Sequence, residues 1–352
     1  MGHRRYALSL AVFAVAAVAG FGLYGRSFEP IAGDLTRIGW YAENEFGPTL
    51  PDHRFAPPLA EAGRLDGAYD IVAVGDSFTV DEADRVGVDW PHFLARDTGL
   101  RIGTFDSGID SLAKVLVSPV YRDRPPAALI YEIRERAFVP EHRAGGGQSC
   151  AATLPTPGHG LFLAPLAAEP REIRRRTERD WHDWPASYAI NYLIQNAIRR
   201  LRGYETTTAV RLELARGGLF SSSNERGLLV YAEDFNKLGW SDADWAAAVC
   251  DLVRLQDRVQ ANGKTAFLAM VVPDKLTVYT PFLPYRKFDG LSHLRQLADV
   301  PTLNLVRLDV ALDPRRAVDL YLPDDTHLSG TGYAIAAERV LDALASRGVV
   351  VR

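Results

Sequence analysis

Short apolar runs that alternate with helical patterns restrict the fold of this chain more than any other feature. The runs interpreted as strands lie at residues 70–74, 101–105, 127–131, 265–272 and 302–308. The patterns interpreted as helices lie at residues 91–98, 187–201, 242–261, 292–298 and 332–346. Strands that alternate with helices form a parallel sheet. The sequence therefore predicts an α/β fold.

One domain with a large insertion accounts for the length of the chain. Its 352 residues, 47% of them hydrophobic, are enough to bury a substantial core. Two domains fit the length equally well. We prefer one domain at 67–352, because regular alternation stops near residue 140 and resumes near residue 235. Residues 26–66 are rich in Gly, Pro and aromatic side chains and are interpreted as an extended arm.

The N-terminus has the pattern of an export signal. Arg4 and Arg5 precede an uncharged apolar run, Tyr6–Tyr24, which is close to the ~20 residues that span a bilayer. Basic residues before such a run favour an N-terminus on the inside and a body on the outside. We therefore predict a signal anchor at 1–25, which attaches a periplasmic body to the inner membrane of the cell envelope. Ala17-Val18-Ala19 also fits a cleavage site, after which the body would be secreted.

Charge and cysteine content restrict the ligands and partners. The net charge of −4 gives no basic field for nucleic acid, which we do not expect as a partner. The sequence contains two cysteines, Cys150 and Cys250. An oxidising compartment would let them pair, and two separate buried thiols are the alternative. Their spacing matches no metal site, and we expect neither a metal nor a cofactor.

Ser77 is the candidate nucleophile. Gly75-Asp76-Ser77-Phe78 follows a predicted buried strand, where a turn can expose the serine hydroxyl and the next helix can direct its amides at an anion. A serine needs a base to attack a carbonyl, and the base needs a carboxylate that fixes its tautomer. Glycine, aspartate and serine are also ordinary turn residues, which is the alternative interpretation.

A second polar motif, near the end of the chain, contains both of the groups that Ser77 needs. Asp324-Asp325-Thr326-His327 stands just before the last predicted helix. We expect His327 to be the base and Asp324 or Asp325 to be the carboxylate, since a turn can bring either one to the ring. Aspartate before a helix is also a common cap. Because both motifs lie at the edges of regular elements, they together predict a catalytic pair.

These two motifs resemble sequence blocks of a known enzyme family. Gly75-Asp76-Ser77-Phe78 resembles the first block of the SGNH (GDSL-like) hydrolases, and residues 324–333 resemble the last. The resemblance implies a flavodoxin-like three-layer fold with a parallel sheet. Ordinary members place the triad aspartate three residues before the histidine, which matches Asp324, to which we lean.

Three segments also resemble the alginate O-acetyltransferase relatives of that family. They are the Gly-Asp-Ser-Phe turn, Glu132-Ile133-Arg134-Glu135-Arg136, and Val272-Pro273-Asp274-Lys275 with the following Tyr279 and Leu283-Pro284. These transferases place the aspartate two residues before the histidine, which matches Asp325. In them the Asp-Thr-His segment precedes the serine motif, whereas here it comes last, as in ordinary SGNH enzymes. The resemblance covers 70–138 and 265–345 and leaves the insertion unexplained.

The resemblance also implies an oxyanion hole formed by the backbone amides of Ser77 and Gly108. The family's third donor, an asparagine amide, has no counterpart here, because residues 132–136 occupy its place. Arg134 and Arg136 would instead bind an anionic sugar or stabilise the oxyanion. A surface ion-pair cluster of these arginines with the neighbouring glutamates is the alternative.

Two more residues are substrate-binding candidates by resemblance alone. Lys275 and Tyr279 match the lysine segment of the transferases. A lysine after a strand is also commonly just solvated. We retain both as candidates for contact with a glycan.

The sequence therefore predicts a serine enzyme of the cell envelope. The predicted reaction is transfer of an acyl group, an acetyl group in the first instance, to an envelope or secreted polysaccharide through an acyl-serine intermediate. The expected partners are an acyl donor, the polysaccharide acceptor and a membrane-bound O-acyltransferase. An acetyl or carbohydrate esterase with the same triad is one alternative. A catalytically silent scaffold or glycan-binding subunit of a polysaccharide export assembly is another, because the asparagine is missing.

Overall fold

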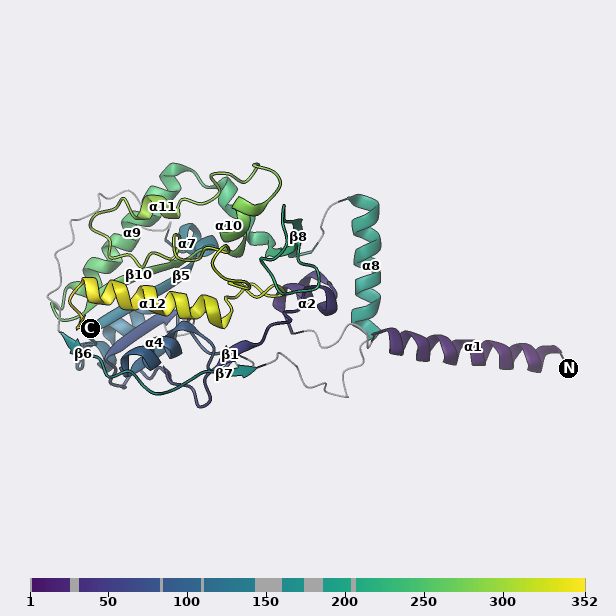
Figure 1. The fold of residues 1–352 in the computed structure, drawn as a ribbon, viewed down its shortest axis with the longest axis horizontal. Helices are drawn as coiled ribbons and strands as arrows, with labels where there is room; N and C mark the ends of the chain where they lie inside the picture. Colours follow the sequence, from purple (N-terminus) through teal and green to yellow (C-terminus); the bar gives the residue numbers. More distant parts are fainter. Residues whose placement is uncertain are drawn as a thin grey trace. The chain divides into compact units, whose positions relative to one another are not determined.

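The computed structural model describes residues 2–25, 32–82, 85–108, 111–142, 160–173, 186–203 and 207–351. It is an α/β structure (Figure 1), and its contacts divide it into two compact units. Unit 1 consists of Met1–Leu50, Arg174–Ala232 and Leu322–Thr326. Unit 2 consists of Pro51–Ile173, Glu233–Tyr321 and His327–Arg352. Each unit is therefore assembled from segments that lie far apart in the sequence.

A five-stranded parallel sheet forms the centre of unit 2. Its strands lie in the order β10 (Ala266–Val272), β5 (Ala128–Arg134), β3 (Ile71–Gly75), β4 (Ile102–Asp106) and β2 (Glu61–Ala62). The fully buried β3 pairs with β4 on one side and β5 on the other, so the winding of the chain reverses at β3. Ligands of open α/β sheets bind outside the carboxyl ends of the strands at such a point.

Helices pack on this sheet because alternate side chains of its buried strands point to opposite faces. Val72 and Val74 of β3 share a core cluster with side chains of α5 (Leu112–Val117), α6 (Pro119–Arg122), α7 (Glu135–His142) and α9 (Asp242–Gln260). α4 (Trp90–Thr98) contacts β4 and packs against α12 (Gly330–Ser346). Figure 1 draws α12 across the near side of the sheet.

Short elements complete unit 2. β1 (Asp52–Arg54) pairs antiparallel with β7 (Arg171–Ile173), and β6 (Leu161–Phe162) pairs parallel with β11 (Val350–Val351). The short helices are η2 (Ala232–Gly239), α10 (Lys275–Tyr279), η3 (Thr280–Phe282) and α11 (Leu294–Leu297). They connect the strands and helices of the main layers.

Unit 1 has a small core of its own. It contains α1 (Gly2–Gly25), α2 (Asp34–Gly39), α3 (Glu43–Phe46), α8 (Ala186–Arg202) and the antiparallel hairpin of β8 (Ala209–Glu213) and β9 (Gly227–Tyr231). Five buried side chains from α2, the α2–α3 region and the hairpin form one cluster: Leu35, Tyr41, Phe46, Ala209 and Leu229. The N-terminal segment and the hairpin are thereby held together.

The N-terminal helix is apolar and exposed. Residues His3–Tyr24 have a mean hydropathy of 2.1 and are long enough to cross a membrane, and none of that window is buried. Such a helix is consistent with a signal sequence or a membrane anchor. This agrees with the sequence interpretation of residues 1–25.

The α/β class and the parallel sheet agree with the sequence prediction, but the strand predicted at 302–308 is not formed. Leu305 makes only an isolated parallel bridge with Ala269. The side chain of Gln256 on α9 donates to the Thr302 carbonyl at 2.6 Å and accepts from the Asn304 amide at 2.7 Å. Because a helix side chain occupies these backbone groups, the segment does not become another full strand of the sheet.

Two predicted segments are divided between the units. The arm at 26–66 belongs to unit 1 up to Leu50 and to unit 2 from Pro51 onward, where it supplies β1 and β2. The insertion at 140–235 is divided after Ile173 and again after Ala232. Cys250 lies on α9, whereas Cys150 lies outside the described residues.

Candidate active site

Ser77 lies in the turn that directly follows β3. The amides of Thr79 and Val80 donate to the Asp76 carbonyl at 2.9 and 3.0 Å, and the Phe78 amide donates to the Asp76 carboxylate at 3.0 Å. Phe78 and Thr79 are buried, whereas Ser77 is only partly buried. The turn therefore holds the Ser77 hydroxyl at the carboxyl edge of the sheet, at the strand where the winding reverses.

A buried glutamate braces this turn from the neighbouring strand. Oε2 of Glu132, on β5, accepts hydrogen bonds from the Asp76 amide at 3.1 Å and from the Thr79 hydroxyl at 3.0 Å. A Cβ atom at position 75 would lie 2.3 Å from that same oxygen and 2.5 Å from Thr79 Oγ1. A larger residue at position 75 would therefore displace the Glu132 carboxylate and the Thr79 side chain.

The environment of Glu132 favours the neutral carboxyl. Burial raises the pKa of Glu132 well above its usual value, and the negative charge of Asp76 raises it further. Its other oxygen, Oε1, has no hydrogen-bond partner among the residues that the structure describes. A proton on Oε1 leaves Oε2 free to accept the two hydrogen bonds of the turn.

His327 is the partner of Ser77. Its Nε2 lies 2.8 Å from Ser77 Oγ, and its ring centroid lies 4.9 Å from that of Phe78. Leu328 forms an antiparallel bridge with Tyr321, and the Ser329 hydroxyl caps α12 by accepting from the Gly332 amide at 3.3 Å. The buried imidazole is thus fixed at the start of a helix. Its distance to the hydroxyl is that of a base and its nucleophile.

The two candidate acids are buried residues of unit 1. The Asp324 carbonyl accepts from the amides of Leu35 and Thr36 at 3.0 and 3.2 Å. Gly33 lies so close that its added Cβ would stand 2.5 Å from that of Asp324. The backbone of this segment is therefore firmly held to α2. The assignment of the acid to Asp324 or Asp325 stays a prediction.

The two backbone amides predicted to form the oxyanion hole differ in whether they already donate a hydrogen bond. The Ser77 amide donates to no other described residue. The Gly108 amide donates to the Asp106 carboxylate at 2.7 Å, and the neighbouring Ser107 amide donates to the Gly75 carbonyl at 2.7 Å. The end of β4 is thereby tied to the end of β3. Gly108 would have to exchange Asp106 for an oxyanion in order to act as a donor.

The two predicted substrate-binding arginines lie in different places. Arg134 Nη1 pairs with Asp76 Oδ2 at 2.5 Å, next to Ser77, and this ion pair is partly exposed. Arg136 Nη1 instead pairs with Asp274 at 2.9 Å and lies 3.5 Å from Asp234, with only 9% of its side chain exposed. Arg134 thus acts on the turn of Ser77, whereas Arg136 is part of a buried cluster.

The alternative of a surface ion-pair cluster at 132–136 is wrong for the two glutamates, because both are buried. The two glutamates lie in different elements, because β5 ends at Arg134 and α7 begins at Glu135. Side chains on either side of this boundary leave the backbone in different directions. Glu132 therefore reaches the Ser77 turn, whereas Glu135 reaches the ammonium of Lys237 at 2.9 Å.

Lys275 and Tyr279 are also in the interior. Lys275 is 1% exposed and begins α10, and Tyr279 is fully buried. Burial raises the pKa of Tyr279 far above its usual value. In this conformation neither side chain offers a surface to a polysaccharide.

Sequence reasoning missed the buried cation Lys237. Its ammonium lies 2.9 Å from Glu135, 2.6 Å from Asp274 and 2.8 Å from the Thr277 hydroxyl. Burial opposes the charge, but the neighbouring carboxylates outweigh burial and hold the pKa of Lys237 above its usual value. No signal in the sequence marks it, because a lysine among acidic residues resembles a solvated loop.

Comparisons of the chain with protein-family models, with curated proteins and with solved structures find no match. The function is therefore inferred from the residues of the site themselves.

Proposed function

We propose that this chain is a serine-dependent O-acyltransferase of the SGNH type, with a flavodoxin-like catalytic domain. The observation that carries the proposal is the 2.8 Å distance between Ser77 Oγ and His327 Nε2 at the carboxyl end of β3. A base must lie within hydrogen-bond distance of the proton that it removes. Here the base and nucleophile come from opposite ends of the sequence, each fixed at the edge of a regular element.

The first half-reaction forms an acyl-serine. The Ser77 hydroxyl gives its proton to His327 Nε2 while Oγ attacks the ester carbonyl carbon of the donor. The Ser77 amide stabilises the oxyanion of the tetrahedral intermediate. When the intermediate collapses, the bond to the donor alcohol breaks and His327 returns the proton to that leaving oxygen. Asp324 or Asp325 orients the imidazole and stabilises its protonated form.

The second half-reaction transfers the acyl group. A sugar hydroxyl gives its proton to His327 and attacks the acyl carbon, and Ser77 leaves with the proton that His327 returns. The acetyl group is the proposed acyl group, because the segments at 132–136 and 272–284 resemble alginate O-acetyltransferases. A membrane-bound O-acyltransferase is the proposed source of acyl groups.

The proposed location is the periplasmic side of the inner membrane. The exposed apolar helix α1 is long enough to serve as the anchor. Arg4 and Arg5 precede its apolar run, which favours an inside N-terminus. The polysaccharide acceptor is then an envelope or secreted glycan.

The test uses the full chain in detergent micelles with an activated acetyl ester and polysaccharide fragments. Ser77→Ala and His327→Ala are compared with the wild type, with Ser346→Ala and His293→Ala as controls elsewhere in unit 2. Loss of a triad member lowers turnover by roughly 10⁴-fold or more. Mass spectrometry of trapped intermediates should find the acetyl group on Ser77 and, after transfer, on the glycan.

The other outcomes contradict the proposal in distinct ways. Turnover that depends on Ser77 and His327 but releases only free acetate, with glycan present, indicates an esterase. An unlabelled Ser77 and equal activity in all variants indicate a catalytically silent subunit.

A further inference from the structure

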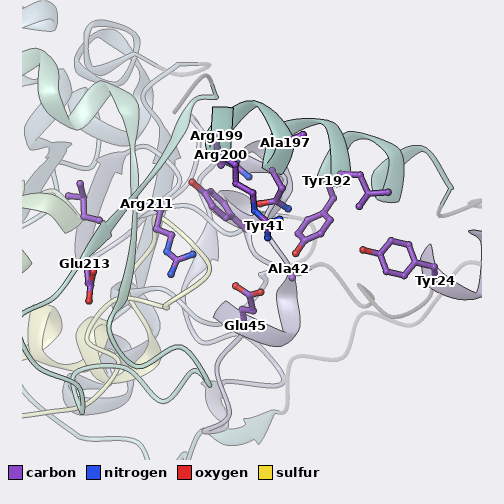
Figure 2. Close-up of a pocket in the computed structure, with 13 residues that line it drawn as sticks. Tyr24, Tyr41, Ala42, Glu45, Tyr192, Ala197, Arg199, Arg200, Arg211 and Glu213 are labelled. Carbon is purple, nitrogen blue, oxygen red and sulfur yellow. The ribbon is translucent and has the colours of Figure 1, made fainter. Parts of the chain in front are cut away.

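Unit 1 contains a pocket that the proposed reaction does not use. It has a volume of about 860 Å³ and is lined by residues from the end of α1, the α2–α3 region, α8 and β8. Figure 2 shows Tyr24 and Tyr192 at one end of this pocket and Arg211 and Glu213 toward the other. Arg199 and Arg200 approach it from α8 between these ends. The pocket thus combines aromatic side chains with several cations.

Two of these cations are available to a ligand. Arg200 and Arg211 are exposed, and neither forms an ion pair or a hydrogen bond with a described residue. Arg199 differs, because its guanidinium donates to the Gly39 and Trp40 carbonyls and lies 4.1 Å from the Tyr41 ring centroid. Arg199 therefore supports the pocket wall, whereas the other two arginines offer their donors to the pocket.

The carboxylates of the pocket do not cancel this positive charge. Glu45 and Glu213 line it, but Glu213 is paired with Arg226 at 3.0 Å. Among the described residues, the guanidinium groups of Arg200 and Arg211 and the carboxylate of Glu45 have no ion-pair partner, so two cations stand against one anion here. The pocket has the chemistry to accept an anion, and guanidinium groups match the geometry of a phosphate.

The pocket adjoins the end of the apolar helix. Phe21 of α1 packs against a cluster of Ala42 and Ala189, together with Tyr188 and Tyr192 of α8. Tyr24, in the last turn of α1, lines the pocket. Tyrosines are typical of the membrane–water interface. If α1 spans the membrane, the pocket lies at the level of the lipid headgroups.

Helix α8 has an exposed apolar face beside this pocket. Ile190, Leu193, Ile194 and Leu201 are each more than two-fifths exposed, and Leu201 reaches 85%. Their spacing places them along one side of the helix. Figure 1 draws α8 running across the line of α1 rather than along it. A helix with an apolar face and neighbouring arginines, set across a membrane-spanning helix, has the properties of an interfacial helix.

We propose that α1 is retained as a membrane anchor, that α8 lies in the headgroup layer of the same membrane, and that the pocket binds an anionic phospholipid headgroup. Arg200 and Arg211 hold the phosphate, and the apolar face of α8 contacts the acyl chains. The occupant is a lipid of the bilayer that α1 enters, because Tyr24 joins the anchor to the pocket. The packing of Phe21 ties the end of α1 to unit 1.

The first experiment measures lipid binding by the full chain. The protein in detergent micelles is titrated with phosphatidylglycerol or phosphatidylcholine, and bound lipid is counted by native mass spectrometry. The wild type should bind one molecule of phosphatidylglycerol more tightly than phosphatidylcholine. The double variant Arg200→Gln/Arg211→Gln should reduce that difference in affinity about thirtyfold, which is the effect of two arginines near an anionic surface. The control Arg286→Gln/Arg315→Gln changes the net charge equally at exposed sites of unit 2 and should retain the preference.

The second experiment measures the depth of α8. Leu201→Trp and Lys264→Trp variants are reconstituted in bilayers with brominated lipid, and the quenching of the added tryptophan is compared. Greater quenching at position 201 supports the proposal. Equal binding of both lipids, a preference that survives the double variant, or equal quenching at both positions would overturn it. A dimer in micelles would also overturn it, since a second copy would then cover α8.

Discussion

Residues 132–136 contribute charged side chains to two regions of the molecule. The two regions differ in how far these charges are exposed to solvent. Next to Ser77, the ion pair of Arg134 with Asp76 is partly open to solvent, with 32% and 18% of the two side chains exposed. Around Lys237, the ammonium and the carboxylates of Glu135 and Asp274 are completely enclosed. The first region holds the turn that carries the Ser77 hydroxyl, and the second fills the interior beside β10.

The contrast teaches how differently the two regions respond to a lost partner. An exposed ion pair contributes only ~0–1 kcal/mol, so its removal leaves the fold intact. A buried charge that loses its partner costs ~3–5 kcal/mol, because the remaining charge cannot reach water. Substitutions in the first region should therefore change turnover, and substitutions in the second should change stability.

The largest expected effect on stability is that of Lys237→Met. The substitution leaves the carboxylates of Glu135 and Asp274 buried without their shared cation, and we expect a loss of ~3–5 kcal/mol in the free energy of unfolding. Denaturant unfolding of the full chain in micelles measures it. Lys264→Met, at an exposed lysine, is the control and should change stability by less than ~0.5 kcal/mol. Equal stability of both variants would show that the buried cluster does not need its cation.

The next effect is a pH dependence from the same buried cluster. Burial raises the pKa of Asp234 to about 7, and the charge of Asp274 contributes to this. The folded protein then retains a proton that the unfolded chain releases above about pH 4. Stability from this group is thus complete below about pH 4 and is lost as the pH rises through about 7.

Asp234→Asn should flatten that dependence. We expect the free energy of unfolding to fall less steeply between about pH 4 and 7 in this variant than in the wild type. Asp289→Asn, at an exposed carboxylate, should keep the wild-type slope. Identical slopes in all three proteins would mean that Asp234 is ionised throughout this range.

A smaller effect, on turnover instead of stability, is expected for Arg134→Gln. Without the guanidinium, Asp76 loses the partner that holds the turn of Ser77, and we expect kcat to fall about tenfold, equivalent to ~1.4 kcal/mol. Stability should change by at most ~1 kcal/mol. Arg315→Gln, which removes another exposed ion pair, should leave kcat unchanged. A rise in KM at constant kcat would instead assign Arg134 to substrate binding.

The smallest effect is expected for Glu132→Gln. Because burial and Asp76 favour the neutral carboxyl, a neutral amide can still accept from the Asp76 amide and the Thr79 hydroxyl. We expect a change in stability below ~1 kcal/mol. Glu132→Ala removes the acceptor and should cost more, ~1–3 kcal/mol, since two donors lose their partner. A glutamine variant as unstable as Lys237→Met would show that Glu132 is ionised.

The sequence alone was sufficient to predict those strands of the sheet that are buried on both faces. β3, β5 and β10 are nearly continuous apolar runs, and such runs depend little on their surroundings. The segment at 302–308 mixes apolar residues with Thr302, Asn304 and Arg307 and is not a strand, because Gln256, far away in the sequence, binds its backbone. Competition of this kind depends on tertiary contacts that a local pattern does not contain.

The candidate site, like the sheet, could be predicted only in part. Two polar motifs at the edges of regular elements indicated Ser77 and His327, and the structure brings their side chains together. The division of residues 132–136 between two regions was not predictable, since it depends on the exact residue at which β5 gives way to α7. The interior position of Tyr279 likewise follows from packing around a short helix.

The hydrogen bonds from α2 to the Asp324 carbonyl also affect how the chain folds during synthesis. The amides of Leu35 and Thr36 are made early, but their acceptor follows roughly 290 residues later. At the ~5–20 residues per second of translation, these amides lack their acceptor for roughly 15–60 s. Unit 1 is therefore completed only when residues 322–326 arrive, so the first helices of the chain reach their final form only near the end of synthesis.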